Sequence, residues 1–153
     1  FCRGVLETVK KLGWSPDIIH CHGWMTSLIP LLIKTSYRED PVFKDAKVVY
    51  SVYDDNFEEQ FEADYSRKVM MEGMTTADLK DLKTPTWEGI TLNAISKSDA
   101  IIQGSEAVLS PAVKTAIKKT GKPFIEFKSA EEYVDAYNAL YDDLVVEDSV
   151  LVD

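Results

Sequence analysis

Cysteine and histidine are scarce in this sequence of 153 residues, which has two of each. Cys2 and Cys21 are too few for a disulfide framework, so we expect both to be reduced and packed. Structural zinc takes about four convergent ligands. His20 and His22 share one face of an expected strand and Cys21 points to the other. We therefore expect no metal site, one histidine as a buried hydrogen-bonding group, and His22 as a residue that could line a pocket.

Long apolar runs are missing as well: none approaches the roughly 18 residues of a membrane helix. No signal peptide is visible. The net charge of −9 disfavours a role on nucleic acid or on anionic membranes, since either needs a basic face. Three patterns do not occur: the phosphate-binding GxGxxG and GxxxxGK[ST], and the nucleophile elbow GxSxG. With 45% apolar residues the chain is expected to be globular. We also expect it to be cytoplasmic.

The sequence alternates between strand and helix patterns. Short apolar runs predict strands at 18–21, 48–53, 100–103 and 124–127. Apolar stripes at helical spacing predict helices over 5–12, 24–34, 87–95, 109–117 and 133–144. Pro30 should kink or restart the second helix, and the fourth should begin at Ser105 or at Ser110. Continuously apolar strands separated by helices predict an α/β fold with a parallel sheet and helices on both faces.

The organisation along the chain is that of one lobe, residues 1–145, followed by an acidic tail, residues 146–153. A long polar stretch over 54–86, with at most short helices, is typical of a lid or a binding loop. The chain opens at Phe1, without Met and within a helical pattern, so we take it for an excerpt of a longer protein.

Candidate site residues follow the expected strands, because ligands of such folds bind beyond the carboxyl ends of the strands. Trp24 could be a platform for a sugar ring or a core residue. Asp54 and its neighbour Asp55 could form an acid or metal site or a solvated surface. The Gly104–Ser105 turn could present N–H groups to an anion or be an ordinary turn.

The segment from Trp14 to Trp24, WSPDIIHCHGW, resembles the PDIIHxHDW segment of bacterial glycogen synthases and plant starch synthases. The helix that follows has its proline, Pro30, at the family's place. Lys47 to Tyr53 is similar to the strand that ends in the family's TVHN motif. Gly89 to Ser105 is similar to GI…ADxVTTVSP. The resemblance covers residues 1–117.

The resemblance implies a Rossmann-like fold like the N-terminal lobe of a two-lobed GT-B glycosyltransferase. It also implies transfer of glucose from ADP-glucose or UDP-glucose to an α-1,4-glucan with retained configuration and without a metal or other cofactor. In the family, the acidic residue and Trp of the first motif and the His of the second lie by the donor sugar. Trp24 matches, whereas Gly23 stands at the acidic position, Tyr53 at the histidine and Asp54 at its Asn neighbour.

Two functions of different kinds follow. The first is a glucosyltransferase fragment that is inactive alone, because the family's KTGGL donor loop and second lobe are not in this chain. The second is a non-catalytic module that binds glucan or a protein partner. A doubly wound domain of unrelated function is a third reading. Expected partners are an α-glucan, a nucleotide sugar or a second copy of the chain. The residues expected to bind substrate are His22, Gly23, Trp24, Tyr53, Asp54 and Ser105.

Overall fold

The computed structural model describes the backbone of residues 1–149 as one α/β unit with a single sheet. Residues 146–149 of the acidic tail expected at 146–153 belong to the last helix, and residues 150–153 lie outside the described residues. In chain order the elements are α1 (Cys2–Leu12), β1 (Ile18–His22), the 3-10 helix η1 (Trp24–Thr26), α2 (Leu28–Lys34), β2 (Lys47–Val52), α3 (Tyr65–Val69), the 3-10 helix η2 (Lys80–Leu82), α4 (Trp87–Lys97), β3 (Ala100–Gln103), α5 (Pro111–Thr120), β4 (Phe124–Ile125) and α6 (Tyr133–Ser149).

All four strands run parallel, in the order β1-β2-β3-β4, as the sequence predicted. The register pairs His20 with Val49, and Val49 with Ala100. Because side chains alternate along a strand, these residues share one face of the sheet, and Cys21, Tyr50 and Ile101 share the other.

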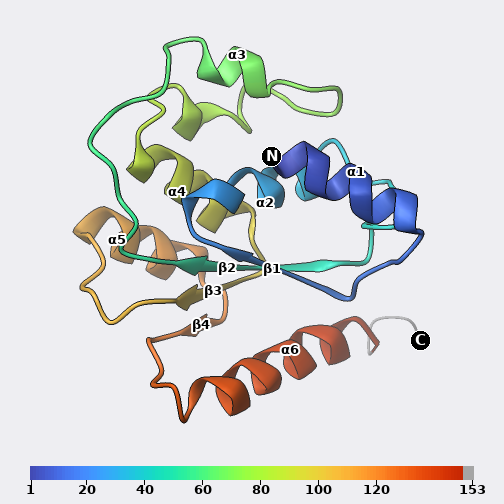
Figure 1. Ribbon diagram of the computed structural model, residues 1–153, viewed down its shortest axis with the longest axis vertical. Coiled ribbons are helices and arrows are strands. Elements are labelled where there is room, and N and C mark those ends of the chain that lie inside the picture. Colours follow the sequence, from blue (N-terminus) through green and yellow to red (C-terminus); the bar gives the residue numbers. More distant parts are fainter. Residues whose placement is uncertain (150–153) are drawn as a thin grey trace.

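Helices cover both faces of the sheet. Figure 1 shows α1, α2 and α4 on one side and α6 alone on the other. The larger core lies between the first group, together with α5, and a row of strand residues that includes Cys21, Tyr50 and Ile101. The smaller core joins Val49, Ala100 and Ile102 to two residues of α6, Leu140 and Leu144. Cys2 and Cys21 are buried and unpaired, as expected.

Local signals explain where several elements begin and end. Gly13 ends α1 in the left-handed conformation, with φ of 66°. Ser110 caps α5, and Pro111 follows in its first turn, so the second of the two predicted starts is the observed one. Among residues 1–149, every helix is too short or too polar to cross a bilayer.

One predicted helix restarts near its proline, as expected, and one predicted strand is shorter than expected. The helix expected over 24–34 is divided into η1 and α2. Pro30 lies in the first turn of α2, where a missing N–H costs little, so α2 restarts before the proline. The strand expected at 124–127 is limited to Phe124–Ile125, since only these residues pair with β3.

Asp78 is one of the residues that hold the polar segment 54–86 to α4, beside a buried apolar cluster that joins Leu79 and Leu82 to Ile90. Its carboxylate accepts hydrogen bonds from the backbone N–H of Thr75 at 2.9 Å and forms an ion pair with Lys97. Its backbone carbonyl accepts a hydrogen bond from Nδ2 of Asn93 at 2.8 Å. The hydrogen bonds from Lys97 and Thr75 lower the pKa of Asp78 to about 2. The segment is therefore anchored, although it has little regular structure.

Asp78→Ala should loosen this segment without unfolding the sheet. Losing the carboxylate contacts removes about 1 kcal/mol of local stability, so proteolytic cleavage within 54–86 should become about fivefold faster. Limited proteolysis followed by mass spectrometry measures the rate. Glu72→Ala is the matched control, because Glu72 is an exposed carboxylate in the same segment. Equal cleavage rates in the two variants would contradict the anchoring role.

Candidate functional site

The carboxyl ends of β1, β2 and β3 lie at one edge of the sheet and bring their turns together. The N–H of Gly23 donates to the carbonyl of Ser51 at 3.1 Å, and the N–H of Gly104 donates to the carbonyl of Val52 at 2.7 Å. Each turn is thereby tied to the neighbouring strand. This edge is where parallel α/β folds bind ligands.

The first cleft, here called the strand-end cleft, has a volume of about 260 Å³. It brings together three residues predicted from the sequence, Tyr53, Asp54 and Ser105. The N–H of Asp54 donates to Oγ of Ser105 at 3.1 Å, which joins the ends of β2 and β3. The other lining residues come from the start of α4 and the approach to α5: Asn56, Trp87, Glu88, Ala107, Val108, Leu109 and Ser110.

Tyr53 reaches the strand-end cleft because Gly104 leaves room for its ring. A Cβ built on Gly104 would lie 2.6 to 2.8 Å from three ring atoms of Tyr53. The ring thus lies against bare backbone, and this close approach needs glycine. Oη of Tyr53 is 2.9 Å from Nδ1 of His22. Burial and the negative charge of Asp55 raise the pKa of Tyr53 above its ordinary value.

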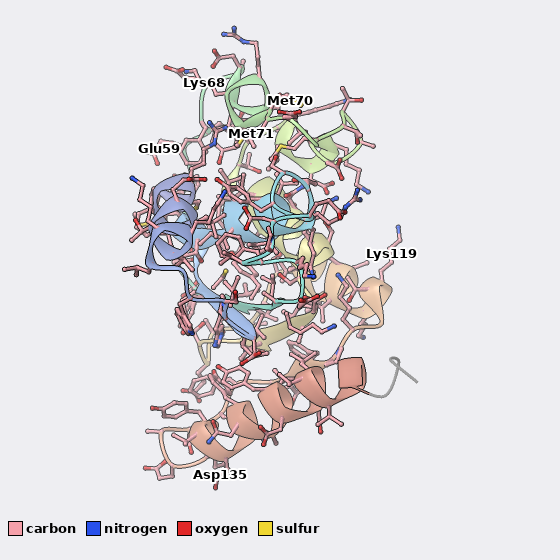
Figure 2. The ribbon with its side chains drawn as sticks, turned by 90° about the vertical axis from the view of Figure 1, so that its right-hand side faces the viewer. Glu59, Lys68, Met70, Met71, Lys119 and Asp135 are labelled. Carbon is pink, nitrogen blue, oxygen red and sulfur yellow. The ribbon has the colours of Figure 1, made fainter. Side chains whose placement is uncertain are left out.

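A second cleft, here called the aromatic cleft, has a volume of about 430 Å³ and lies beside Trp24. The indole is half-buried, and its ring centroid is 5.2 Å from that of Phe57 and 6.1 Å from that of Phe61. The polar residues that line the aromatic cleft are Asp55, Asn56, Glu59 and Gln60. Glu59 is labelled in Figure 2. Asn56 lines both clefts. Phe57 and Phe61 are not among the predicted site residues, because they lie in a polar segment for which only short helices were expected.

Asp55 is not the solvated surface residue that the sequence favoured. It is half-buried, and its two carboxylate oxygens accept different hydrogen bonds. Oδ2 accepts from the backbone N–H of Trp24 at 3.0 Å, and Oδ1 accepts from Nε1 of Trp87 at 2.9 Å. Asp55 therefore links the end of β2 to η1 and to the start of α4. Only the parallel register of β1 and β2 could have revealed this role.

The two histidines lie on the α6 face and are absent from the lining of either cleft. Their ring centroids are 4.0 Å apart. His20 is the expected buried hydrogen-bonding group: Nδ1 is 2.6 Å from Oη of Tyr141 and Nε2 is 2.7 Å from Oγ of Ser51. Burial lowers the pKa of His20 to about 4, with a smaller effect from His22. Within the described residues, no group of three or more His, Cys, Asp or Glu could hold a metal ion.

The lining of both clefts fits a neutral ligand with many hydroxyl groups. Among the residues that the structure describes, no lysine or arginine lines either cleft, and each cleft contains carboxylates, so both repel phosphate. Carboxylates, amides and hydroxyls provide acceptors and donors for sugar hydroxyls. Aromatic rings provide faces on which the C–H groups of a sugar ring can pack. The arrangement can therefore bind a sugar unit.

Comparisons with known proteins show similarity to one family. A family model described as the starch synthase catalytic domain matches residues 1–120. The glycogen synthase of Clostridium perfringens is 37% identical over 108 residues, which cover 69% of this chain and 22% of that protein. The glycogen synthase of Chlorobium luteolum is 59% identical over 53 residues, which cover 35% of this chain and 11% of that protein.

A solved structure has a similar fold. It is the catalytic domain of starch synthase IV from Arabidopsis thaliana bound to ADP and acarbose, with a TM-score of 0.61 and 22% identity. The similarity covers 82% of this chain and 28% of that one. The chain thus spans well under half the length of these relatives, and α6 lies beyond the residues that the family model matches.

Proposed function

Because the chain belongs to the starch synthase catalytic domain family, we propose that it is part of the sugar-binding lobe of a cytoplasmic glucosyltransferase. The resemblance noted in the sequence motifs is confirmed, as is the Rossmann-like α/β fold with a starch synthase catalytic domain of GT-B type as structural neighbour. The proposed reaction of the full-length protein transfers glucose from ADP-glucose or UDP-glucose to an α-1,4-glucan.

The observation that carries the proposal is the pair of phosphate-repelling clefts at the carboxyl edge of the sheet. The strand-end cleft contains Tyr53, Asp54 and Ser105, and the aromatic cleft contains Trp24. Their carboxylates favour a neutral glucan over a pyrophosphate group. The charged part of a nucleotide sugar therefore needs basic groups from outside these two clefts.

We further propose that this chain alone does not catalyse glucosyl transfer. Tyr53 stands at the position of the family's histidine and cannot reproduce the charge of an imidazolium ion. Removing one well-placed transition-state contact costs on the order of 10²–10³ in rate.

Incubation with radiolabelled ADP-glucose and glycogen tests this proposal. We expect no incorporation above background, and the same outcome with UDP-glucose. A glycogen synthase related to the chain serves as the positive control under identical conditions. Robust labelling of glycogen by this chain would show that it is a complete catalyst and would overturn the proposed inactivity.

A non-catalytic glucan-binding module is the second candidate, and one observation favours it. Trp24 and its aromatic neighbours form a cleft, while Gly23 and Tyr53 depart from the family pattern. Binding of a glucan without turnover would need the aromatic residues around Trp24. It would not need the family's residues at positions 23 and 53.

Affinity electrophoresis in glycogen gels tests glucan binding. We expect glycogen to retard the wild-type chain and Trp24→Ala to bind at least about tenfold more weakly, since stacking on an aromatic ring is lost. Trp14→Ala is the matched control, because Trp14 is 63% exposed and lies outside the lining of the aromatic cleft. Equal retardation of the wild type and both variants would argue against binding at Trp24.

A further inference from the structure

A carboxylate occupies the space beside Gly23, although residue 23 has no side chain. A Cβ built on Gly23 would lie 2.3 Å from Oδ2 of Asp55 and 3.6 Å from its Cγ. Gly23 has φ of 69°, a conformation that other residues rarely adopt. A side chain at residue 23 and the carboxylate of Asp55 therefore exclude each other.

The pairing of β1 with β2 explains how Asp55 reaches this position. His22 pairs with Ser51 in the parallel register, and the N–H of Gly23 donates to the carbonyl of Ser51. The chain leaving β2 thus passes alongside the turn that leaves β1. Asp55 lies at the end of this passage, and the N–H of Trp24 and Nε1 of Trp87 hold its carboxylate in place.

We propose that Asp55 supplies the carboxylate that residue 23 lacks, and that this carboxylate binds a hydroxyl group of a glucose unit lying on Trp24. The proposal rests on the proposed function and deepens it. In the motif that the first turn resembles, an acidic residue stands where this chain has Gly23. Here the same chemical group comes from the neighbouring strand.

The carboxylate has the capacity for this role. Two carboxylate oxygens offer about four lone-pair sites, and the two tryptophan N–H groups use two of them. The remaining sites can accept hydrogen bonds from sugar hydroxyls. Asp55 lines the aromatic cleft together with Trp24, so a sugar ring packed on the indole would have a fixed acceptor beside it. Glu59 and Gln60 on the same cleft give further polar partners.

Binding of maltoheptaose to the whole chain, measured by isothermal titration calorimetry, tests the proposal. Asp55→Asn keeps the shape and one acceptor oxygen but removes the negative charge. We expect it to weaken binding at least about tenfold, the usual loss for a hydrogen bond to a charged acceptor. Glu58→Gln is the matched control, since it removes one exposed charge from the same segment outside the cleft lining. Its affinity should stay within about twofold of the wild type.

The outcomes separate the proposal from its premise. If the wild type does not bind maltoheptaose, glucan binding by this chain fails, and the role of Asp55 fails with it. If the wild type binds and Asp55→Asn binds within twofold of it, the role of Asp55 is overturned while glucan binding stands. Weaker binding with unchanged tryptophan emission supports a direct contact with the sugar.

Trp87→Phe decides the remaining outcome, in which Asp55→Asn shifts the tryptophan emission. It removes the hydrogen bond from Nε1 of Trp87 to Oδ1 of Asp55 and leaves the carboxylate itself in place. Affinity within about twofold of the wild type in Trp87→Phe, with Asp55→Asn at least about tenfold weaker, supports a requirement for the carboxylate. Equal weakening in the two variants would show that Asp55 acts only by holding the tryptophans and would overturn the proposal.

Discussion

Gly89→Ala is expected to lower the free energy of unfolding by about 2 to 3 kcal/mol, the cost of overpacking a rigid contact. In an exposed helix the same substitution normally stabilises by about 0.5 to 1 kcal/mol. Here a Cβ on Gly89 would lie 2.6 Å from the carbonyl oxygens of Asp81 and Thr84. Both are backbone atoms, so the segment before α4 must move as a whole. That segment leads into Trp87, which lines the strand-end cleft.

Gly4→Ala is the matched control, because Gly4 also lies within a helix but has no atom within 4 Å of its built Cβ. It should raise the free energy of unfolding by about 0.5 to 1 kcal/mol. Urea unfolding followed by circular dichroism measures both variants, and an unchanged m-value supports comparison within a two-state scheme. Stabilisation by both substitutions would mean that α4 does not pack against those carbonyls.

The parallel sheet was predictable because the apolar composition of each strand, read from its own residues, indicates a strand buried on both faces. Val48 to Val52 consists of β-branched and aromatic residues apart from Ser51, and the structure buries all five. The Ser110–Pro111 pair likewise contains a cap and a first-turn proline, so the start of α5 needed no tertiary information. Phe124 to Phe127 has the same composition as a strand, but its length depends on how far β3 extends beside it.

The site was only partly predictable, because its essential contacts depend on which strands are neighbours. Tyr53, Asp54 and Ser105 follow strand ends, and the general rule for α/β folds places them together. The sequence leaves Asp55 open between a site residue and a solvated surface residue, since an acidic residue that enters a polar segment gives no local sign of burial. Its partners, Trp24 and Trp87, are 31 and 32 residues away. The carboxylate of Asp55 takes the space that a side chain at residue 23 would need, and only the folded structure shows this.

The stability of the contact between α6 and the sheet is expected to depend on pH through His20. α6 covers its face of the sheet alone, with Asp135 on its outer side (Figures 1 and 2). Between α6 and β1, Oη of Tyr141 is 2.6 Å from Nδ1 of His20, and the ring of Tyr137 lies edge-on to the same imidazole. From the sheet, Ser51 and His22 face His20, and Tyr53 follows beyond His22. No carboxylate is among these neighbours to stabilise an imidazolium ion.

Acid is therefore expected to destabilise the fold through His20. Burial lowers its pKa from 6.5 to about 4, so the unfolded chain takes up the proton first as the pH falls. The stabilising contribution is complete above pH 6.5 and is lost progressively as the pH falls from 6.5 towards 4. A shift of this size corresponds to about 3 kcal/mol at full burial, and partial exposure of the ring reduces it to about 2 kcal/mol.

Comparing His20→Gln with the wild type separates the effect of His20 from that of the carboxylates. The two proteins have the same carboxylates, so only the titration of His20 differs between them. The variant should be less stable than the wild type at pH 7.5, because glutamine does not reproduce both hydrogen bonds of the imidazole ring with Tyr141 and Ser51. Between pH 7.5 and 4.5, however, the wild type should lose about 2 kcal/mol more than the variant loses, as measured by urea unfolding. Parallel pH profiles would mean that His20 titrates alike in the folded and unfolded chains. The contact between His20 and α6 would then be open to water rather than closed by Tyr137 and Tyr141.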